Sequence, residues 1–582
     1  MLLPLCAAGL LRAALPKPPW RMVNSNDLTH IVSCMSPYNK VLSYEHPRSP
    51  DNVLTDDMIR ASVDEMAVKG MDAQFLQPGY CWIAWWPSRI APVKDADSWF
   101  EGHYGKPVNN IYHNYLKNGG DIISVFIDQC RRRNQAAVIS FRLNDSHHLP
   151  YADDPEGYQG LTINRFYVEH PQYRLGTKKT RDDAVFNWLI PEVRDYKFSL
   201  IEELCQQYDI DGLELDFMRH ARYFPDDTPP QERLRIMEDF IKRVRALLDR
   251  TQRGDKYRWL GARIPLDDKL WKNLGIDLKR WNRAGISFFN LSSGYCFTQQ
   301  NSVAKARAQV PDAAIYLELT HTPQTWNWGG IGFDSFSHRR GTREMFASTA
   351  ALAGRRGADG ISWFNFVYYR EYGAQIKERG PYYEPPFDYM TDAVAALRRK
   401  QNPDYFYRLI PRSTISRQGD ARSFTMDMVP PPDGQTMTLR LQVVSNDERN
   451  TPALTYLNID RGDWEVRFNG EILAPEKIRI PFIPSLPPLR WDSGTSDNIW
   501  LGICPHLRCA TARTKSSCAC FAPPQISPCA CIGLRLTQNL RPQNTRNLGL
   551  CADLESETIK NLKTLFPSRS FHFLLFGLSC YA

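Results

Sequence analysis

Eight short runs with β-strand character alternate with helix-like segments between residues 28 and 402. These runs are 30–34, 72–78, 136–143, 211–218, 259–265, 286–292, 313–320 and 359–367. Strands that alternate with helices in this way predict a parallel sheet with helical crossovers, because parallel strands need long connections. Eight strand–helix units in one domain favour an α/β fold of the (β/α)8 TIM barrel type, and an open doubly wound sheet is the alternative.

Long loops follow three of the predicted strands. They span residues 79–119, 144–181 and 321–340. All three would lie at the carboxyl ends of the strands, where barrel enzymes build their sites. We therefore expect a substrate cleft at that end of the barrel.

The flanking regions have a different character. Residues 1–27 form an N-terminal extension whose apolar run is interrupted by Arg12, which indicates a secretory signal only weakly and leaves the compartment open. Residues 412–502 show alternating strand patterns between Pro and Gly turns, which predict a small β-sandwich. Residues 503–582 are rich in Cys and Pro without periodicity, and we predict an irregular tail, either disordered or an artefact of gene prediction.

Composition and charge narrow the class of partner. The chain has 43% hydrophobic and 23% charged residues, as soluble globular proteins do. Its net charge of +8 comes mostly from the segment after residue 503, so the main body has no basic stripe for nucleic acid. No stretch approaches the roughly 20 apolar residues that a membrane span requires.

The cysteines do not predict a metal site. Of the 14 cysteines, six are scattered singly and are expected to be small buried hydrophobic residues. In the tail, Cys518 with Cys520 and Cys529 with Cys531 are each one residue apart, which is tighter than the spacing of zinc knuckles. We predict neither a metal nor another cofactor.

Two acidic residues lie in the fourth run, Asp-Gly-Leu-Glu-Leu-Asp-Phe-Met, at positions 211–218. Alternate side chains of a strand share a face, so Leu213 and Leu215 would pack against helices while Glu214 and Asp216 point into the barrel. The same alternation in the seventh run turns Glu318 inward. Acids from opposed strands are therefore expected at one mouth.

Glycoside hydrolysis uses two carboxyl groups that flank the bond to be cleaved. Asp216 and Glu318 could form such a pair, with Glu214 as an orienting neighbour bonded to Arg142 or Arg263, which also face inward. The alternative is that these acids only pair with buried arginines. In that case the chain would be a catalytically inactive carbohydrate-binding barrel.

The segment 190–220 resembles the glycosyl-hydrolase-like (β/α)8 barrel families, which are distantly similar to alpha-amylase-type barrels. The resemblance is carried by Pro-Glu-Val-Arg at 191–194, by Tyr-Asp-Ile-Asp-Gly at 208–212 and by the strand that ends in Asp216. It covers residues 180–295 and, in outline, residues 28–402, and it implies hydrolysis of O-glycosyl bonds in a poly- or oligosaccharide.

The chain departs from two better known patterns. Alpha-amylases carry an Arg two residues before the nucleophilic Asp, where this chain has Glu214, and the fifth strand here lacks their proton donor. Chitinase-like barrels carry a catalytic Glu where this chain has Met218. The substrate therefore stays open.

Further polar and aromatic residues near the strand ends are candidates for substrate binding. They are Arg142, Asn144, His220, Arg263, Asn290, His321 and Asn365, together with Trp326, Trp328 and Trp363 as platforms for sugar rings. Trp82, Trp85 and Trp86 could serve as platforms too. His147, His148, His220 and His321 raise a third hypothesis, a metal-dependent hydrolase, but the first run has a single His30 where barrel amidohydrolases have a pair.

Overall fold

The computed structural model describes most of the barrel region and parts of the C-terminal region. The described residues are 15–27, 31, 53–79, 83–108, 110–146, 164–176, 185–294, 296–320, 341–366, 387–403, 406–407, 421–434, 439–443, 464–472, 478–479, 499–503 and 529–536.

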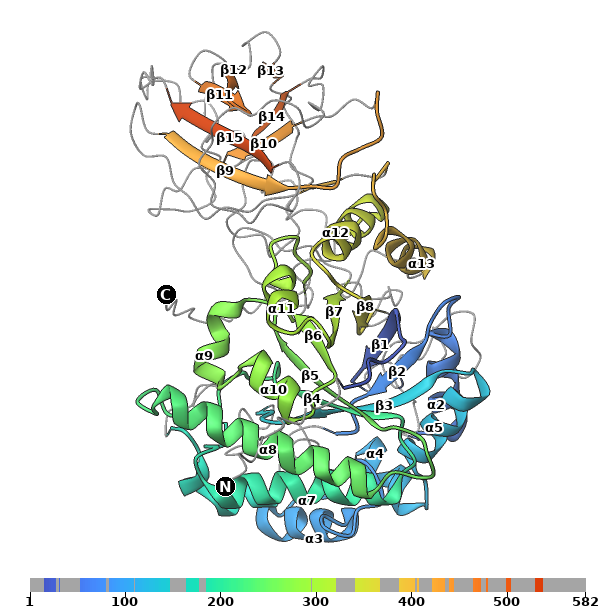
Figure 1. The fold of residues 1–582 in the computed structure, drawn as a ribbon. Helices are drawn as coiled ribbons and strands as arrows, with labels where there is room; N and C mark the ends of the chain where they lie inside the picture. The colour runs from blue at the N-terminus through green and yellow to red at the C-terminus, as the bar shows by residue number, and fades with distance from the viewer. Residues whose placement is uncertain are drawn as a thin grey trace, which may run out of the picture.

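Eight parallel strands form a closed barrel in sequence order (Figure 1). The strands are β1 (Met22–Asn26), β2 (Ala73–Leu76), β3 (Ala136–Arg142), β4 (Gly212–Asp216), β5 (Trp259–Pro265), β6 (Phe288–Ser292), β7 (Ala314–Leu319) and β8 (Gly360–Phe364). Because β8 pairs with β1, the sheet has no free edge. The predicted (β/α)8 barrel is confirmed, and the open doubly wound sheet is wrong.

Helices follow each strand. They are α2 (Asp56–Glu65), α3 (Val93–Tyr104), α4 (Ile111–Lys117), α5 (Ile122–Arg132), α6 (Arg165–Glu169), α7 (Pro191–Gln207), α8 (Pro230–Arg250), α9 (Trp271–Leu274), α10 (Leu278–Ala284), α11 (Val303–Gln309), α12 (Arg343–Arg355) and α13 (Phe387–Ala396). The longest, α8, begins with Pro at its first turn, where the missing N–H leaves no bond unmade. Helices α3, α4 and α6 lie in the long loops after β2 and β3.

The first strand lies earlier than predicted. β1 spans residues 22–26 instead of 30–34, so the barrel begins inside the predicted N-terminal extension. Its sequence, Met-Val-Asn-Ser-Asn, has none of the apolar alternation that marks a strand. It is nevertheless buried along its whole length, because it lies between β2 and β8. Of the run 30–34, only Ile31 is among the described residues.

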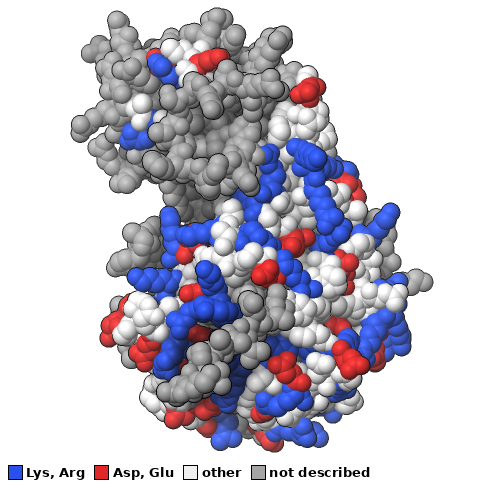
Figure 2. All heavy atoms as spheres, in the orientation of Figure 1, with Lys and Arg blue, Asp and Glu red and all other residues white. Residues whose placement is uncertain are grey.

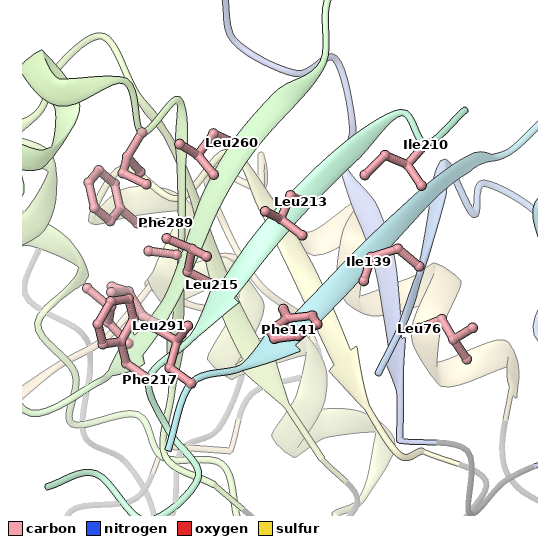
Figure 3. Close-up of a cluster of buried hydrophobic side chains, with 14 of the residues drawn as sticks. Leu76, Ile139, Phe141, Ile210, Leu213, Leu215, Phe217, Leu260, Phe289 and Leu291 are labelled. Atoms are coloured by element: carbon pink, nitrogen blue, oxygen red, sulfur yellow. The ribbon is translucent and has the colours of Figure 1, made fainter. Parts of the chain in front are cut away.

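The strands have an apolar outer face. Figure 3 shows Leu213 and Leu215 of β4, with Phe217 directly after it, beside Ile139 and Phe141 of β3, and all five are buried. They belong to the core between the sheet and the helices. The alternation predicted for β4 is therefore confirmed, and Glu214 and Asp216 lie on the opposite, inner face.

The inner face is apolar at one end of the barrel. A second core cluster there contains Trp20, Val23, Phe75, Val138, Phe288 and Tyr316. The Tyr316 hydroxyl donates to the carbonyl of Trp20 (3.0 Å), which fixes the N-terminal segment across this end. Gly261 makes room for the Phe288 ring, since a Cβ there would come within 2.0 Å of it. The packed aromatic end leaves the opposite end for polar groups.

Two small sheets follow the barrel (Figure 1). β9 (Ala421–Asp427), β11 (Trp464–Phe468), β12 (Glu471–Ile472) and β15 (Cys529–Leu536) form one, and β10 (Leu439–Val443), β13 (Ile478–Arg479) and β14 (Ile499–Ile503) form the other. β15 lies in the segment predicted to be an irregular tail, yet it pairs with β9 and β11. A boundary at residue 502 would divide that sheet. The packing of both sheets as a sandwich stays a prediction.

The start of the C-terminal region is attached to the barrel. Arg356, next to α12, pairs with Asp427 of β9 (2.6 Å). The Tyr407 hydroxyl donates to the carbonyl of Val429 (3.0 Å), and Val429 is fully buried in the main core cluster. The chain before residue 408 and the chain after residue 420 thus both contribute to the packing around α12.

Charges of both signs occur on the face of the molecule shown in Figure 2. Neighbouring helices are joined by ion pairs, such as Asp195 of α7 with Arg243 of α8 (2.5 Å). Cys130, Cys205 and Cys296 are buried and unpaired, as predicted for the scattered cysteines. In the parts of the chain that the structure describes, no helix has the length and apolar character needed to cross a membrane.

Candidate active site

Polar side chains fill the barrel interior toward the carboxyl ends of the strands. The buried set comprises Gln77, Ser140, Arg142, Glu214, Asp216, Arg263, Asn290, Ser292, Glu318 and Ser362. The parallel register explains their meeting, because it places Arg142 beside Asp216 and Asp216 beside Arg263 on the same face of adjacent strands. The polar groups predicted to face inward are therefore brought together.

Arg263 joins the two proposed catalytic acids. Its Nε and Nη2 donate to the two carboxylate oxygens of Glu318 at 2.6 and 2.7 Å. Its Nη1 donates to Asp216 Oδ2 at 3.1 Å and to Oδ1 at 3.3 Å. Burial opposes the charge of Arg263, but the Glu318 and Asp216 carboxylates outweigh this effect and raise its pKa above the ordinary value. One permanent cation therefore serves both acids.

Asp216 is held from its other side by Gln77 and by backbone. Gln77 Nε2 donates to Oδ2 (2.9 Å), and the backbone N–H of Met218 donates to Oδ1 (2.8 Å). Each oxygen of Asp216 thus has two donors, which fixes the plane of the carboxylate. Glu318 is held as firmly, since the Ser292 hydroxyl (2.5 Å) and the Asn290 amide (3.3 Å) donate to it as well as Arg263.

Arg142 extends these contacts to the first strands. Its Nε donates to Gln77 Oε1 (2.8 Å), its Nη1 to Asp145 (2.9 Å) and its Nη2 to Asp27, directly after β1 (3.1 Å). We call Asp27, Gln77, Arg142, Asp216, Arg263 and Glu318 the polar network. Its members come from β1, β2, β3, β4, β5 and β7 or from the residues that follow them.

Glu214 lies one inward position deeper than Asp216. Its carboxyl group accepts from the Ser140 hydroxyl (2.6 Å) and the Asn290 amide (3.2 Å). The prediction that Glu214 bonds to an arginine is wrong, because Arg263 is taken by Asp216 and Glu318, and Arg142 by Gln77, Asp27 and Asp145. Burial raises the pKa of Glu214 to about 8, with the Ser140 hydrogen bond acting in the opposite direction. Glu214 is therefore protonated at neutral pH.

Two predicted substrate-binding residues have structural positions instead. Asn144 donates to the carbonyls of Phe186 (3.0 Å) and Arg222 (2.6 Å) and accepts from the Phe186 N–H (3.1 Å), so its amide is used in joining loops. Trp363 lies on the helix-facing side of β8, fully buried against Phe346 of α12. Neither position fits contact with a sugar.

Arg142 and Arg263 are likewise engaged with acids, and they serve the network instead of an open surface. Asn290 lies in the barrel interior among Glu214, Glu318 and Ser362, and its buried Oδ1 has no hydrogen-bond partner among the described residues. The Asn290 amide therefore links Glu214 to Glu318 of the polar network.

His220 and Asn365 are near the mouth in unusual backbone conformations. Their φ angles are 49° and 46°, in the left-handed region that non-glycine residues seldom adopt. His220 Nδ1 accepts from the Ser146 N–H (3.1 Å), and Asn365 Oδ1 accepts from the Asp27 N–H (3.2 Å). Such conformations concentrate at functional sites. Substrate binding by these two residues stays a prediction.

Two of the tryptophans proposed as sugar platforms lie in the core. Trp85 and Trp86 are buried, the first stacked on Tyr112 and the second donating to Glu203 (3.1 Å). His147, His148, His321, Trp82, Trp326 and Trp328 lie outside the described residues. Among the residues that are described, no group of three or more His, Cys, Asp or Glu side chains could hold a metal ion.

Sequence reasoning missed several members of the site. Gln77, Asp27 and Asp145 were not predicted, although each follows a strand closely and so lies at the mouth. Ser140, Ser292 and Ser362 were missed because small hydroxyl residues on a strand carry no distinct signal. Their inward alternation with Arg142, Asn290 and Phe364 could have indicated them.

The sequence matches the family model Glycosyl hydrolase-like 10 over residues 90–235. This segment includes β3, β4 and Asp216. The resemblance to glycosyl-hydrolase-like barrels is therefore confirmed over that part of the chain. No curated protein matches the chain.

Solved structures of similar fold include glycoside hydrolases. An alpha-L-fucosidase, isoenzyme 2, from Paenibacillus thiaminolyticus is 13% identical with a TM-score of 0.36, covering 66% of this chain and 49% of its own. This chain thus spans about half of that protein's length. A maltogenic alpha-amylase from Thermotoga neapolitana is 11% identical with a TM-score of 0.35, covering 78% of this chain and 93% of its own.

Proposed function

We propose that the chain is a glycoside hydrolase-like enzyme that cleaves glycosidic bonds of a poly- or oligosaccharide, with Asp216 as its reacting carboxylate. The observation that carries this proposal is the position of Asp216 at the carboxyl end of β4, inside the segment that matches the family model. A fixed carboxylate at that place suits attack on an anomeric carbon or stabilisation of the positive charge that develops there.

Glu318 is the second carboxylate of the proposed mechanism. Its proton-donor role requires that Arg263 release it when substrate enters. Arg263 already contacts Asp216 through Nη1, so the proposed step shifts the guanidinium further toward Asp216 and frees Glu318. Once released, Glu318 would take up a proton from solvent, and the glycosidic C–O bond would break as that proton passes to the leaving oxygen. In the same step Asp216 bonds to the anomeric carbon, or a water molecule bonds there and gives its proton to Asp216.

A catalytically inactive carbohydrate-binding barrel is the second candidate. The bidentate contact between Arg263 and Glu318 favours it, because this pairing resembles a structural ion pair of a barrel interior. In either case we propose carbohydrate as the ligand and the two C-terminal sheets as a β-sandwich that packs on the barrel.

The test is an activity screen of the full chain on polysaccharides and aryl glycosides, beside D216N, E318Q and D239N. Asp239 is an exposed acid of α8 and serves as a matched control. Turnover by wild type and D239N, with loss in D216N and E318Q at unchanged circular dichroism, supports the proposed hydrolase. Saturable glycan binding without turnover, unaffected by either variant, would support the binding barrel. Stoichiometric zinc or manganese in elemental analysis would favour the metal-dependent hydrolase.

A further inference from the structure

Gln77 is a buried amide between a cation and the proposed reacting carboxylate. It lies directly after β2 and is 1% exposed. Its Oε1 accepts from Arg142 Nε (2.8 Å), and its Nε2 donates to Asp216 Oδ2 (2.9 Å). It therefore joins Arg142 to Asp216.

The amide of Gln77 has a single favourable orientation. A guanidinium can only donate and a carboxylate can only accept, so exchanging the oxygen and nitrogen of the amide would break both contacts. Arg142 is itself fixed, because its other nitrogens donate to Asp145 (2.9 Å) and Asp27 (3.1 Å). The N–H of Gln77 is thus aimed at Asp216 by a chain of contacts that begins on β1 and β3.

We propose that Gln77 is a positioning residue for Asp216, and that Arg142 acts through Gln77 instead of contacting substrate. Gln77 holds one oxygen of Asp216 from the β2 side while Arg263 holds the carboxylate from the β5 side. The kinetic part of this inference rests on the proposed function. Its structural part, the coupling of positions 77 and 216, does not.

The isosteric variant Q77E tests the contact between Gln77 and Asp216, because it introduces an ionisable group at position 77. When the introduced carboxyl group is protonated, its O–H can replace the amide donor to Asp216. When it is ionised, its oxygen faces the Asp216 carboxylate at the same short distance. The charged groups around position 77 are Arg142, which attracts the new carboxylate, Asp216, which repels it, and beyond these Asp27, Asp145 and Arg263. The variant should therefore lose function as the pH rises.

The structural readout is the melting temperature of Q77E, D216N and the double variant Q77E/D216N at pH 5 and pH 8. We expect Q77E to fall further below wild type at pH 8 than at pH 5. D216N should reverse part of this loss, because the amide that it introduces can donate to the carboxylate that Q77E introduces. Q74E, alone and combined with D216N, is the matched control. Gln74 is also buried on β2, but it contacts Gln135 and the Val63 carbonyl instead of an acid. Additive effects in the double variant, or equal coupling of D216N to Q74E, would overturn the inference.

The kinetic readout is kcat and KM over the same pH range. We expect Q77E to keep activity at pH 5 and lose it at pH 8, and Q77L to lose about ten- to hundredfold in kcat at both, with KM little changed. Equal kcat in Q77L and wild type would overturn the kinetic part. Coupling in the melting experiment without turnover by wild type would keep the positioning role and reject the proposed function.

Discussion

The buried acids in the barrel outnumber the cations that reach them. Asp216 and Glu318 share Arg263, while Glu214 has only the Ser140 hydroxyl and the Asn290 amide among the described side chains. An unpaired carboxylate in a dry interior is costly, and a buried carboxyl group avoids that cost by keeping its proton. The three acids of the inner face therefore divide into two that pair with Arg263 and one that stays neutral.

This division predicts how Glu214 affects stability. An ordinary Glu in the unfolded chain loses its proton near pH 4.3, whereas Glu214 in the folded protein keeps it up to about pH 8. Between these values the folded state binds more protons, so the free energy of unfolding falls as the pH rises and stays reduced above pH 8.

E214Q removes this pH-dependent fall in the free energy of unfolding, while it keeps the shape of the side chain and its capacity for hydrogen bonds. We expect E214Q to be more stable than wild type at pH 8 by about 2 to 5 kcal/mol and nearly equal to it at pH 4. Urea unfolding at both pH values measures the difference. A gain that is independent of pH would show that Glu214 does not carry the extra proton.

At this scale the sequence indicated which acids face inward but not how they pair. The alternation of side chains in β4 and β7 was sufficient to predict that Glu214, Asp216 and Glu318 point into the barrel. The pairing of Asp216 and Glu318 with Arg263 depends on the register of strands β4 to β7. The residue pattern of a single strand does not show that register. Gln77 was missed for the same reason, since its role exists only through Arg142 and Asp216.

Among the elements, the loop after β2 is attached to α7 by one carboxylate. Glu203 accepts from Trp86 Nε1 (3.1 Å), the Ser88 hydroxyl (2.6 Å) and the backbone N–H groups of Arg89 (2.5 Å) and Ile90 (3.3 Å). A carboxylate suits this position because it offers only acceptors. The anchored loop leads into α3.

E203Q should therefore loosen this loop. An amide nitrogen would face donors, and we expect a loss of about 1 to 3 kcal/mol in the free energy of unfolding, with faster hydrogen exchange at residues 86–90. The neighbouring Glu202 is partly exposed and pairs with Arg250, so E202Q is the matched control and should change stability by less than about 1 kcal/mol. Equal effects of both variants would contradict the anchoring role.

The elements were predicted where their residues alternate and missed where neighbours impose the strand. Seven barrel strands follow apolar runs, and α8 follows its helical periodicity. β1 has a polar sequence, and it is a strand because β2 and β8 supply its hydrogen bonds. β15 was missed in a similar way, since its pairing with β9 spans the whole C-terminal region.

On the scale of the whole molecule, the barrel core extends beyond the barrel sequence. Val429 follows β9 but is fully buried in the main core cluster. V429A should lower the free energy of unfolding of the barrel by about 2 kcal/mol, since two buried carbon atoms are removed. Urea unfolding followed by tryptophan fluorescence measures it. I472A, at a residue of β12 that is 57% exposed, should leave the transition unchanged. An unchanged transition in V429A would mean that this segment folds apart from the barrel.

Azide rescue of D216A on an activated aryl glycoside tests most directly whether Asp216 acts at the anomeric carbon. Azide is small enough to take the place of the missing carboxylate. We expect D216A to lose hydrolysis and azide to restore release of the aryl group, with a glycosyl azide as the product, seen by mass spectrometry. Hydrolysis by D216A at the wild-type rate, with no glycosyl azide formed, would contradict it.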